Sequence, residues 1–139
     1  MAFTIRPFED RDEAAVVALW HAAFPDDPRR NDPFAIIRRK RRVQPELFLV
    51  AEIDGRIVAT VVAGYDGHRG WIYHLAVAAG ARRKGHGRAM MEAAEARLRA
   101  LGCPKLNLQL HRFNAAVVAF YEALGYTVED RISMGKVLS

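Results

Sequence analysis

The spacing of apolar residues changes along the chain between the two-residue period of strands and the longer period of helices. Helical spacing predicts helices that begin near residue 10, at residue 33, at residue 89 and at residue 114. Apolar, β-branched or alternating runs predict strands at residues 3–8, 47–53, 56–65, 71–78, 105–111, 126–129 and 131–138. This succession of helices and strands predicts one α/β domain across residues 1–139, with helices layered on a sheet.

Turn and capping residues support several of these boundaries. Asp54-Gly55, between two strands, is a strong signal for a two-residue hairpin. Asp32 before Pro33 predicts a helix start, because aspartate caps a helix and proline suits its first turn. Asn114 predicts another capped helix, which Gly125 ends.

The composition is that of a folded protein with local basic clusters. Hydrophobic residues make up 51% of the 139 residues and charged residues 27%, so a core can be filled. The net charge is +5, and the excess lies in residues 29–42, which include the basic run Arg38–Arg42, and in residues 82–88. Basic clusters attract phosphates, but the first cluster also fits a solvated helix face. It lacks interleaved aromatic residues and any nucleic-acid-binding motif, so nucleic acid is not the expected partner.

The sequence lacks the patterns of a membrane span, of a signal peptide and of paired cysteines. No apolar stretch approaches the ~20 residues of a membrane span, and the first residues carry no signal-peptide pattern. The single Cys103 excludes an intramolecular disulfide and a zinc site built on cysteines. We therefore expect a cytoplasmic protein that has no metal site and does not span a membrane.

Residues 75–89 are predicted to form a strand, a basic glycine loop and the start of a helix. Glycines let the backbone approach a ligand closely, and the free N–H groups of a helix N-terminus favour anions. This pattern predicts a phosphate-binding loop, with a purely structural turn as the alternative. A Walker A loop is excluded, because Gly85 is followed by His86 and Gly87 rather than by Lys and Ser or Thr. The dinucleotide-binding pattern G-x-G-x-x-G is absent as well.

Two motifs in this order resemble those of the GNAT N-acetyltransferases. Arg82-x-x-Gly85-x-Gly87, after a strand ending Leu75-Ala76-Val77, looks like the acetyl-CoA signature of the family. Residues 114–126 look like its second hallmark, and the similarity is greatest to the small bacterial YpeA-like acetyltransferases. The resemblance implies the GNAT fold, an α/β fold. Its central sheet is mixed and mostly antiparallel, with six to seven strands and about four helices on both faces.

The resemblance also implies roles for individual residues. The strand backbone at Leu75, Ala76 and Val77 would pair with the pantetheine arm of acetyl-CoA, the co-substrate. Asn114 and Tyr121 would contact the cofactor from a second helix. Tyr121 would also be the general acid that protonates the departing thiolate, with a core aromatic residue at helical spacing as the alternative. The residues that would bind the pyrophosphate are Arg82, Arg83, Lys84, Gly85, His86, Gly87 and Arg88.

Three positions depart from the family pattern. Ala79 stands where a proline is common, which should loosen the loop slightly. His86 replaces a residue that is usually aliphatic, and we expect its side chain to face solvent. Trp71 stands where some members carry a catalytic glutamate. The base that takes a proton from the attacking amine is therefore unassigned.

Four residues are candidates for this base. Asp66 and His68 lie in the polar, glycine-flanked loop of residues 65–70, and Tyr73 and His74 lie on the following strand. We expect the loop to border the acceptor, with Asp66 or His68 assisting deprotonation. A turn or packing role is the alternative for each candidate.

The function expected from these features is transfer of the acetyl group of acetyl-CoA directly to a primary amine. A ternary complex without a covalent intermediate suffices, because no Cys or Ser lies in a nucleophile motif. The acceptor would be a small-molecule or peptide amine. One alternative is a CoA-binding sensor of the same fold that does not catalyse, and a weaker one is a basic nucleic-acid-binding domain. A homodimer is also open, since dimers are common in the family.

Overall fold

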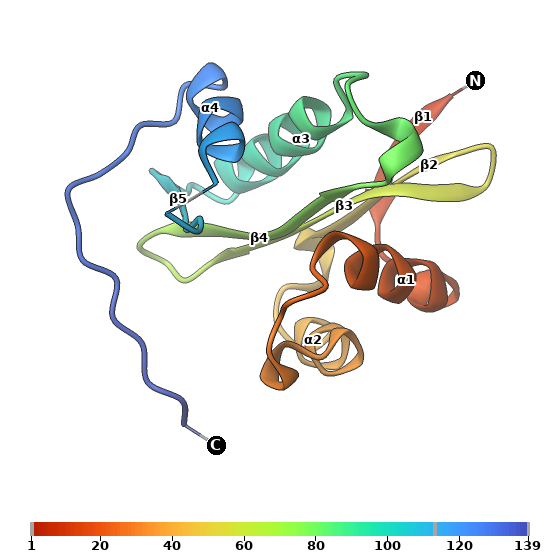
Figure 1. The fold of residues 1–139 in the computed structure, drawn as a ribbon, viewed down its shortest axis with the longest axis horizontal. Coiled ribbons are helices and arrows are strands. Elements are labelled where there is room, and N and C mark those ends of the chain that lie inside the picture. Colours follow the sequence, from red (N-terminus) through yellow and green to blue (C-terminus); the bar gives the residue numbers. More distant parts are fainter. Residues whose placement is uncertain (1, 113, 139) are drawn as a thin grey trace. The chain divides into compact units, whose positions relative to one another are not determined.

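The computed structural model describes residues 2–112 and 114–138, which form two compact units. The first unit ends at Leu108 and contains a five-stranded sheet with the strand order β1-β2-β3-β4-β5 (Figure 1). The second unit begins at Gln109 and contains one helix. The strands are β1 (Phe3–Pro7), β2 (Phe48–Ile53), β3 (Arg56–Tyr65), β4 (Gly70–Val77) and β5 (Leu106–Leu108).

The described residues form four α-helices, as the sequence predicted. In the first unit, α3 covers one face of the sheet, and α1 and α2 lie on the other (Figure 1). Asp32 caps α2, because its Oδ2 atom accepts a hydrogen bond from the Ala35 N–H at 3.1 Å. None of these helices is long and apolar enough to cross a membrane. The helices are α1 (Glu13–Ala23), α2 (Pro33–Lys40), α3 (His86–Ala100) and α4 (Ala115–Ala123).

The sheet is mixed and mostly antiparallel. The pairs β1–β2, β2–β3 and β3–β4 are antiparallel, and β5 adds to β4 in parallel. Asp54 and Gly55 join β2 to β3 with positive φ angles of 51° and 75°, as a two-residue hairpin turn requires. The expected hairpin is therefore confirmed.

The expected count of six to seven strands is wrong: the described residues form a sheet of five. Residues 126–129 and 131–138 were predicted to be strands, but residues 126–138 form no regular secondary structure where the structure describes them. From Val128 onward their apolar side chains are exposed, for example Ile132 at 90% and Met134 at 91%. β propensity measures how well a residue fits a pleated, half-buried surface. Without a pairing strand, the apolar alternation of this segment produces no strand.

An apolar cluster joins the sheet to α1 and α2. Trp20 of α1 and Phe48 of β2 are both 1% exposed, and their rings stack with centroids 5.7 Å apart. Ile37 of α2 is buried in the same cluster. Burial of such side chains contributes roughly 1.5–3 kcal/mol each, so this cluster holds the two helices against the strands.

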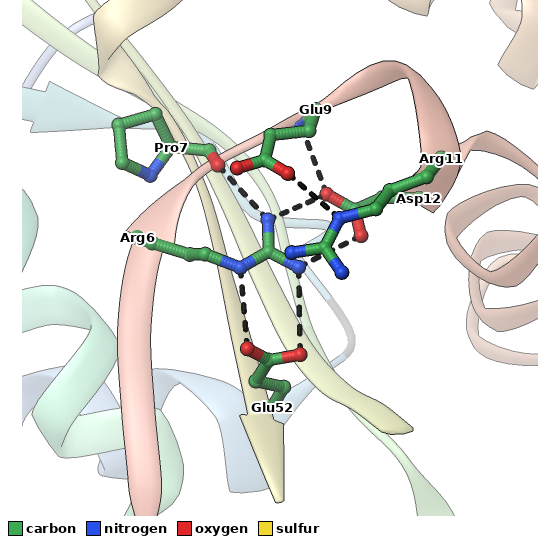
Figure 2. Close-up of polar contacts among 6 residues, drawn as sticks. All are labelled: Arg6, Pro7, Glu9, Arg11, Asp12 and Glu52. Carbon is green, nitrogen blue, oxygen red and sulfur yellow. Dashed lines mark hydrogen bonds and ion pairs between the residues drawn. The ribbon is translucent and has the colours of Figure 1, made fainter. Parts of the chain in front are cut away.

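A charged network fixes the entry to α1. Figure 2 shows the guanidinium of Arg6 between two carboxylates, Asp12 and Glu52. Arg6 donates two hydrogen bonds to Asp12, at 2.7 and 2.9 Å, and the Glu9 N–H donates a third at 2.8 Å. Burial alone would raise the pKa of Asp12, but the hydrogen bonds from Arg6 and from the Glu9 N–H outweigh it. The pKa of Asp12 therefore lies below its usual value.

We predict that Asp12→Asn lowers the free energy of unfolding at neutral pH by about 1.5–3 kcal/mol, because it removes a charged hydrogen-bond acceptor. Since the folded-state pKa is depressed, this contribution is present above the unfolded-state pKa of about 4. It is lost as the pH falls through the folded-state value. Urea denaturation of both proteins between pH 7 and pH 3 measures the difference.

Arg11→Ala is the matched control, because its ion pair with Glu9 is exposed, and it should change stability by no more than about 0.5 kcal/mol. A destabilisation by Asp12→Asn that is the same at every pH would contradict the electrostatic explanation.

Candidate functional site

Strand β4 is paired on both sides only at its beginning. β5 pairs with Gly70, Trp71 and Ile72 and then ends at Leu108. From Tyr73 to Val77, β4 retains β3 on one side, and no described strand pairs with its other side. The free edge includes Leu75, Ala76 and Val77, which the sequence assigned to cofactor binding. An unpaired strand edge can accept an extended ligand as an additional strand.

The register of β4 against β3 shifts at His74. Pairing skips between Thr60 and Val62, and His74 has a positive φ of 50°. The hydroxyl of Thr60, which is fully buried, donates to the His74 carbonyl oxygen at 3.0 Å. The same hydroxyl accepts from the indole Nε1–H of Trp20 at 2.8 Å. This chain of hydrogen bonds from α1 through β3 to β4 satisfies three polar groups and holds the irregular backbone in place.

The irregularity is accompanied by a cavity of about 390 Å³ that His74 lines. The imidazole lies between aromatic rings, with centroids 4.5 Å from Trp20 and 5.0 Å from Phe24. Its Nε2 atom is 3.7 Å from Oδ2 of Asp27, while Nδ1 is buried without a hydrogen-bond partner among the described residues. Asp27 lies in the segment after α1 and also lines the cavity. A histidine and a carboxylate thus face each other in a pocket whose lining combines aromatic and proline side chains with polar ones.

Burial controls the protonation of this histidine. It lowers the pKa of His74 below the usual value of 6.5, and the charge of Asp27 opposes the shift only in part. The ring is therefore neutral at neutral pH. A neutral imidazole can accept a proton, which makes His74 chemically suited to a base.

The glycine loop connects β4 to α3. Arg82 returns to the end of β4, where its Nε–H donates to the Val77 carbonyl oxygen at 3.2 Å. Arg83 and Gly85 have positive φ angles of 63° and 79°, so the backbone turns sharply before the helix begins. No side chain caps α3, and its first turn has no acidic residue. Exposed basic residues thus precede and begin a helix with an uncapped N-terminus, an arrangement that favours a phosphate. The exposed basic residues are Arg82, Arg83, Lys84 and Arg88.

The expectation that His86 faces solvent is wrong. Its ring stacks on Phe3 of β1, with centroids 4.3 Å apart and an interplanar angle of 8°. The Nε2 atom is buried and has no hydrogen-bond partner among the described residues. This stacking anchors the start of α3 to the sheet. Its predicted contact with the cofactor would have to come from its backbone.

The loop of residues 65–70 is a tight turn organised by Asp66. The Oδ1 atom of Asp66 accepts hydrogen bonds from the N–H groups of His68 and Arg69, each at 2.8 Å. The N–H groups of Arg69 and His68 lower the pKa of this carboxylate, which weakens it as a base. His68 is exposed. The structure thus shows a turn-forming role for Asp66, and catalytic roles for Asp66 and His68 stay predictions.

Two predicted site residues lie in the second unit. Asn114 caps α4, with its Oδ1 accepting from the Val117 N–H at 3.4 Å. Tyr121 is 7% exposed, and its ring makes edge-to-face contacts with Phe120 at 5.0 Å and Tyr126 at 5.7 Å. Burial raises the pKa of Tyr121 to about 12. The phenol therefore keeps its proton at neutral pH and could donate it.

Sequence reasoning overlooked Asp27. It lies in Pro25-Asp26-Asp27-Pro28, which reads only as a helix-breaking segment, and nothing in the spacing links it to His74 on β4. A register shift and an aromatic cluster bring the two together. In the part of the chain that the structure describes, no group of three or more His, Cys, Asp and Glu side chains could hold a metal ion.

Several known proteins are similar to this chain in sequence or in structure. The chain matches the model of the acetyltransferase (GNAT) family over residues 13–126. It is 45% identical over 134 residues to an acetyltransferase of Yersinia enterocolitica, covering 96% of this chain and 94% of the relative. Its structure is similar to that of Ard1 from Thermoplasma volcanium, with a TM-score of 0.82, 25% identity, and 93% and 85% of the two chains covered. A PaiA N-acetyltransferase from Thermoplasma acidophilum, solved with coenzyme A, is also similar in structure, with a TM-score of 0.74 and 20% identity. This similarity covers 95% of this chain and 94% of that protein.

We predict that Thr60→Val lowers the free energy of unfolding by about 1–3 kcal/mol. The two side chains have nearly the same shape, but the valine leaves the Trp20 Nε1–H without its acceptor and the His74 carbonyl without its side-chain donor. Urea denaturation measures the loss, and Thr4→Val, at an exposed position of β1, is the control. Equal stability of the two variants would show that the hydrogen-bond chain does not support the β4 irregularity.

Proposed function

Because this chain belongs to the GNAT family of acetyltransferases, we propose that it transfers the acetyl group of acetyl-CoA directly to a primary amine. The observation that carries the proposal is the free edge of β4, from Tyr73 to Val77, which continues into a basic loop and an uncapped helix. An extended arm and a phosphate group could bind side by side there. CoA has both, and the Thermoplasma acidophilum relative was solved with this ligand.

The pantetheine arm would lie along β4 as an added strand. Its amide groups would bond to the backbone near Leu75, Ala76 and Val77, and a β4 N–H would polarise the thioester carbonyl. The pyrophosphate would bind the backbone N–H groups of residues 83–88. Charge from Arg82, Arg83 and Lys84 would add to that of the helix N-terminus.

Tyr121 would supply the proton for the leaving group. Expelling a bare thiolate into a partly dry site leaves a charge without solvent, so an acid lowers the barrier. The phenol of Tyr121 is protonated at neutral pH because burial raises its pKa to about 12. In this role Tyr121 and Asn114 would meet the cofactor. No covalent intermediate is required.

The acceptor would enter through the cavity that His74 lines. His74 lines this cavity and directly precedes Leu75 in β4, so an amine bound there would lie close to a thioester on the strand edge. A screen of primary amines with acetyl-CoA, followed through release of free thiol, tests the proposed reaction. Tight binding of acetyl-CoA without turnover of any amine would instead favour a sensor of the same fold.

Acetyl-CoA should raise the melting temperature of the protein, because it binds only the folded state. A concentration one hundred times the Kd adds about 2.7 kcal/mol to the free energy of unfolding. Gly87→Glu should abolish the increase by placing bulk and negative charge beside the pyrophosphate. The control Ala14→Glu adds the same side chain at an exposed position of α1 and should respond as the wild type does. An unchanged melting temperature of wild-type protein in millimolar acetyl-CoA would contradict the cofactor assignment.

Tyr121→Phe should reduce turnover by about 10²-fold or more, because it removes only the hydroxyl that protonates the thiolate. The ring contacts with Phe120 and Tyr126 remain, so the melting temperature and its increase with acetyl-CoA should be retained. Single-turnover kinetics, with chemistry as the measured step, is the assay. Wild-type turnover in that step would leave Tyr121 as a packing residue.

A further inference from the structure

The proposed reaction requires a group that takes a proton from the attacking nitrogen. We propose that His74 is this base, and that Asp27 holds the ammonium group of an acceptor with an apolar body. The inference rests on the proposed function and adds to it a proton acceptor and a class of substrate.

The position of His74 is the first support. The irregularity of β4 is held by the buried hydroxyl of Thr60 and the indole of Trp20, and the His74 imidazole lines the cavity. The next residue, Leu75, belongs to the free strand edge where the thioester would lie. One strand would thus present the base and the acetyl donor at consecutive residues.

The chemistry of the cavity supports the assignment of Asp27. Its Oδ2 atom is 3.7 Å from His74 Nε2, too far for a hydrogen bond to the neutral ring but close enough to stabilise an imidazolium. The other charged or titratable groups that line the cavity are His21, Arg29 and Asp32. The Asp32 carboxylate already caps α2. Asp27 is therefore the carboxylate best placed to pair with an incoming cation.

The walls of the cavity define the rest of the acceptor. Trp20, Phe24, Pro25 and Pro28 contribute apolar surface beside the His74–Asp27 pair. Such a surface favours an apolar or aromatic body attached to the amine. A primary amine on a compact apolar group fits both features.

Protons balance in this scheme. The ammonium N–H bond breaks, the proton moves to His74 Nε2, and the electron pair left on nitrogen forms the C–N bond with the acetyl carbonyl carbon. The C–S bond then breaks and the sulfur takes a proton from Tyr121. His74 releases its proton to water, and the second proton that nitrogen loses restores Tyr121 through solvent. The net products are the amide, free CoA and one proton.

Two acceptor amines of similar shape distinguish a catalytic base at His74 from a purely structural role of this residue. Benzylamine is protonated at neutral pH and needs a base, whereas O-benzylhydroxylamine is largely neutral and does not. His74→Asn should lower kcat/KM for benzylamine by about 10²-fold while changing that for O-benzylhydroxylamine only a few-fold. Asp27→Asn should raise KM for benzylamine with little effect on the neutral probe. His111→Asn, at an exposed position of the second unit, is the control.

The pH profile gives an independent readout. With His74 as base, kcat/KM for benzylamine should be level from below pH 6.5 up to the pKa of the amine, because burial keeps the ring deprotonated. In His74→Asn the neutral amine alone reacts, so kcat/KM should rise tenfold per pH unit over the same range.

Three results would overturn the proposal. The first is that His74→Asn lowers kcat/KM equally for both probes, and the second is that it leaves kcat/KM for benzylamine unchanged. The third is that Asp66→Asn or His68→Ala, rather than His74→Asn, lowers kcat/KM selectively for benzylamine. The increase of melting temperature with acetyl-CoA shows whether each variant is folded. Wild-type protein that binds acetyl-CoA but uses neither probe would refute the acceptor class and hence the inference. Failure to bind acetyl-CoA would refute the proposed function itself.

Discussion

The hydrogen-bond chain from Trp20 through Thr60 to the carbonyl of His74 is the constraint on which the site depends. A residue with a positive φ in the middle of a strand is unfavourable, and it persists only where surrounding contacts fix it. Here the fixing group is a buried hydroxyl that both accepts and donates, supported by an indole packed in the apolar cluster. The stability of the core and the shape of the site are therefore coupled through one threonine.

In the proposed reaction, this constraint gives β4 two separate roles. Beyond Ile72 its edge is free of β5, and its end leads into the basic loop and α3, so one side of the strand suits an extended, phosphate-bearing cofactor. At His74 the same strand lines the cavity next to α1, where Asp27 and aromatic rings surround a neutral imidazole. The proposed transfer thus takes place across a single strand. This explains why the base need not occupy the position of Trp71.

Local chemistry made much of the fold predictable. Asp54-Gly55 specifies a hairpin, Asp32 and Asn114 specify helix starts, and the glycine motif after Val77 marks the loop before α3, because each signal acts within a few residues. The strands proposed for residues 126–138 failed, since strand formation depends on a distant partner that the alternation of residues does not reveal. The packing of His86 on Phe3 and the pairing of His74 with Asp27 also join distant positions. Sequence alone could name His74 as one of four candidates but could not rank it first.

A crystal structure of the complex with CoA tests most directly whether β4 organises the site. The pantetheine arm should pair with the backbone of residues 73–77, the pyrophosphate should bind the N–H groups of residues 83–88, and His74 should keep its positive φ beside the thiol. CoA bound away from β4, or a β4 that regains regular pairing at His74 in the complex, would contradict this role of β4.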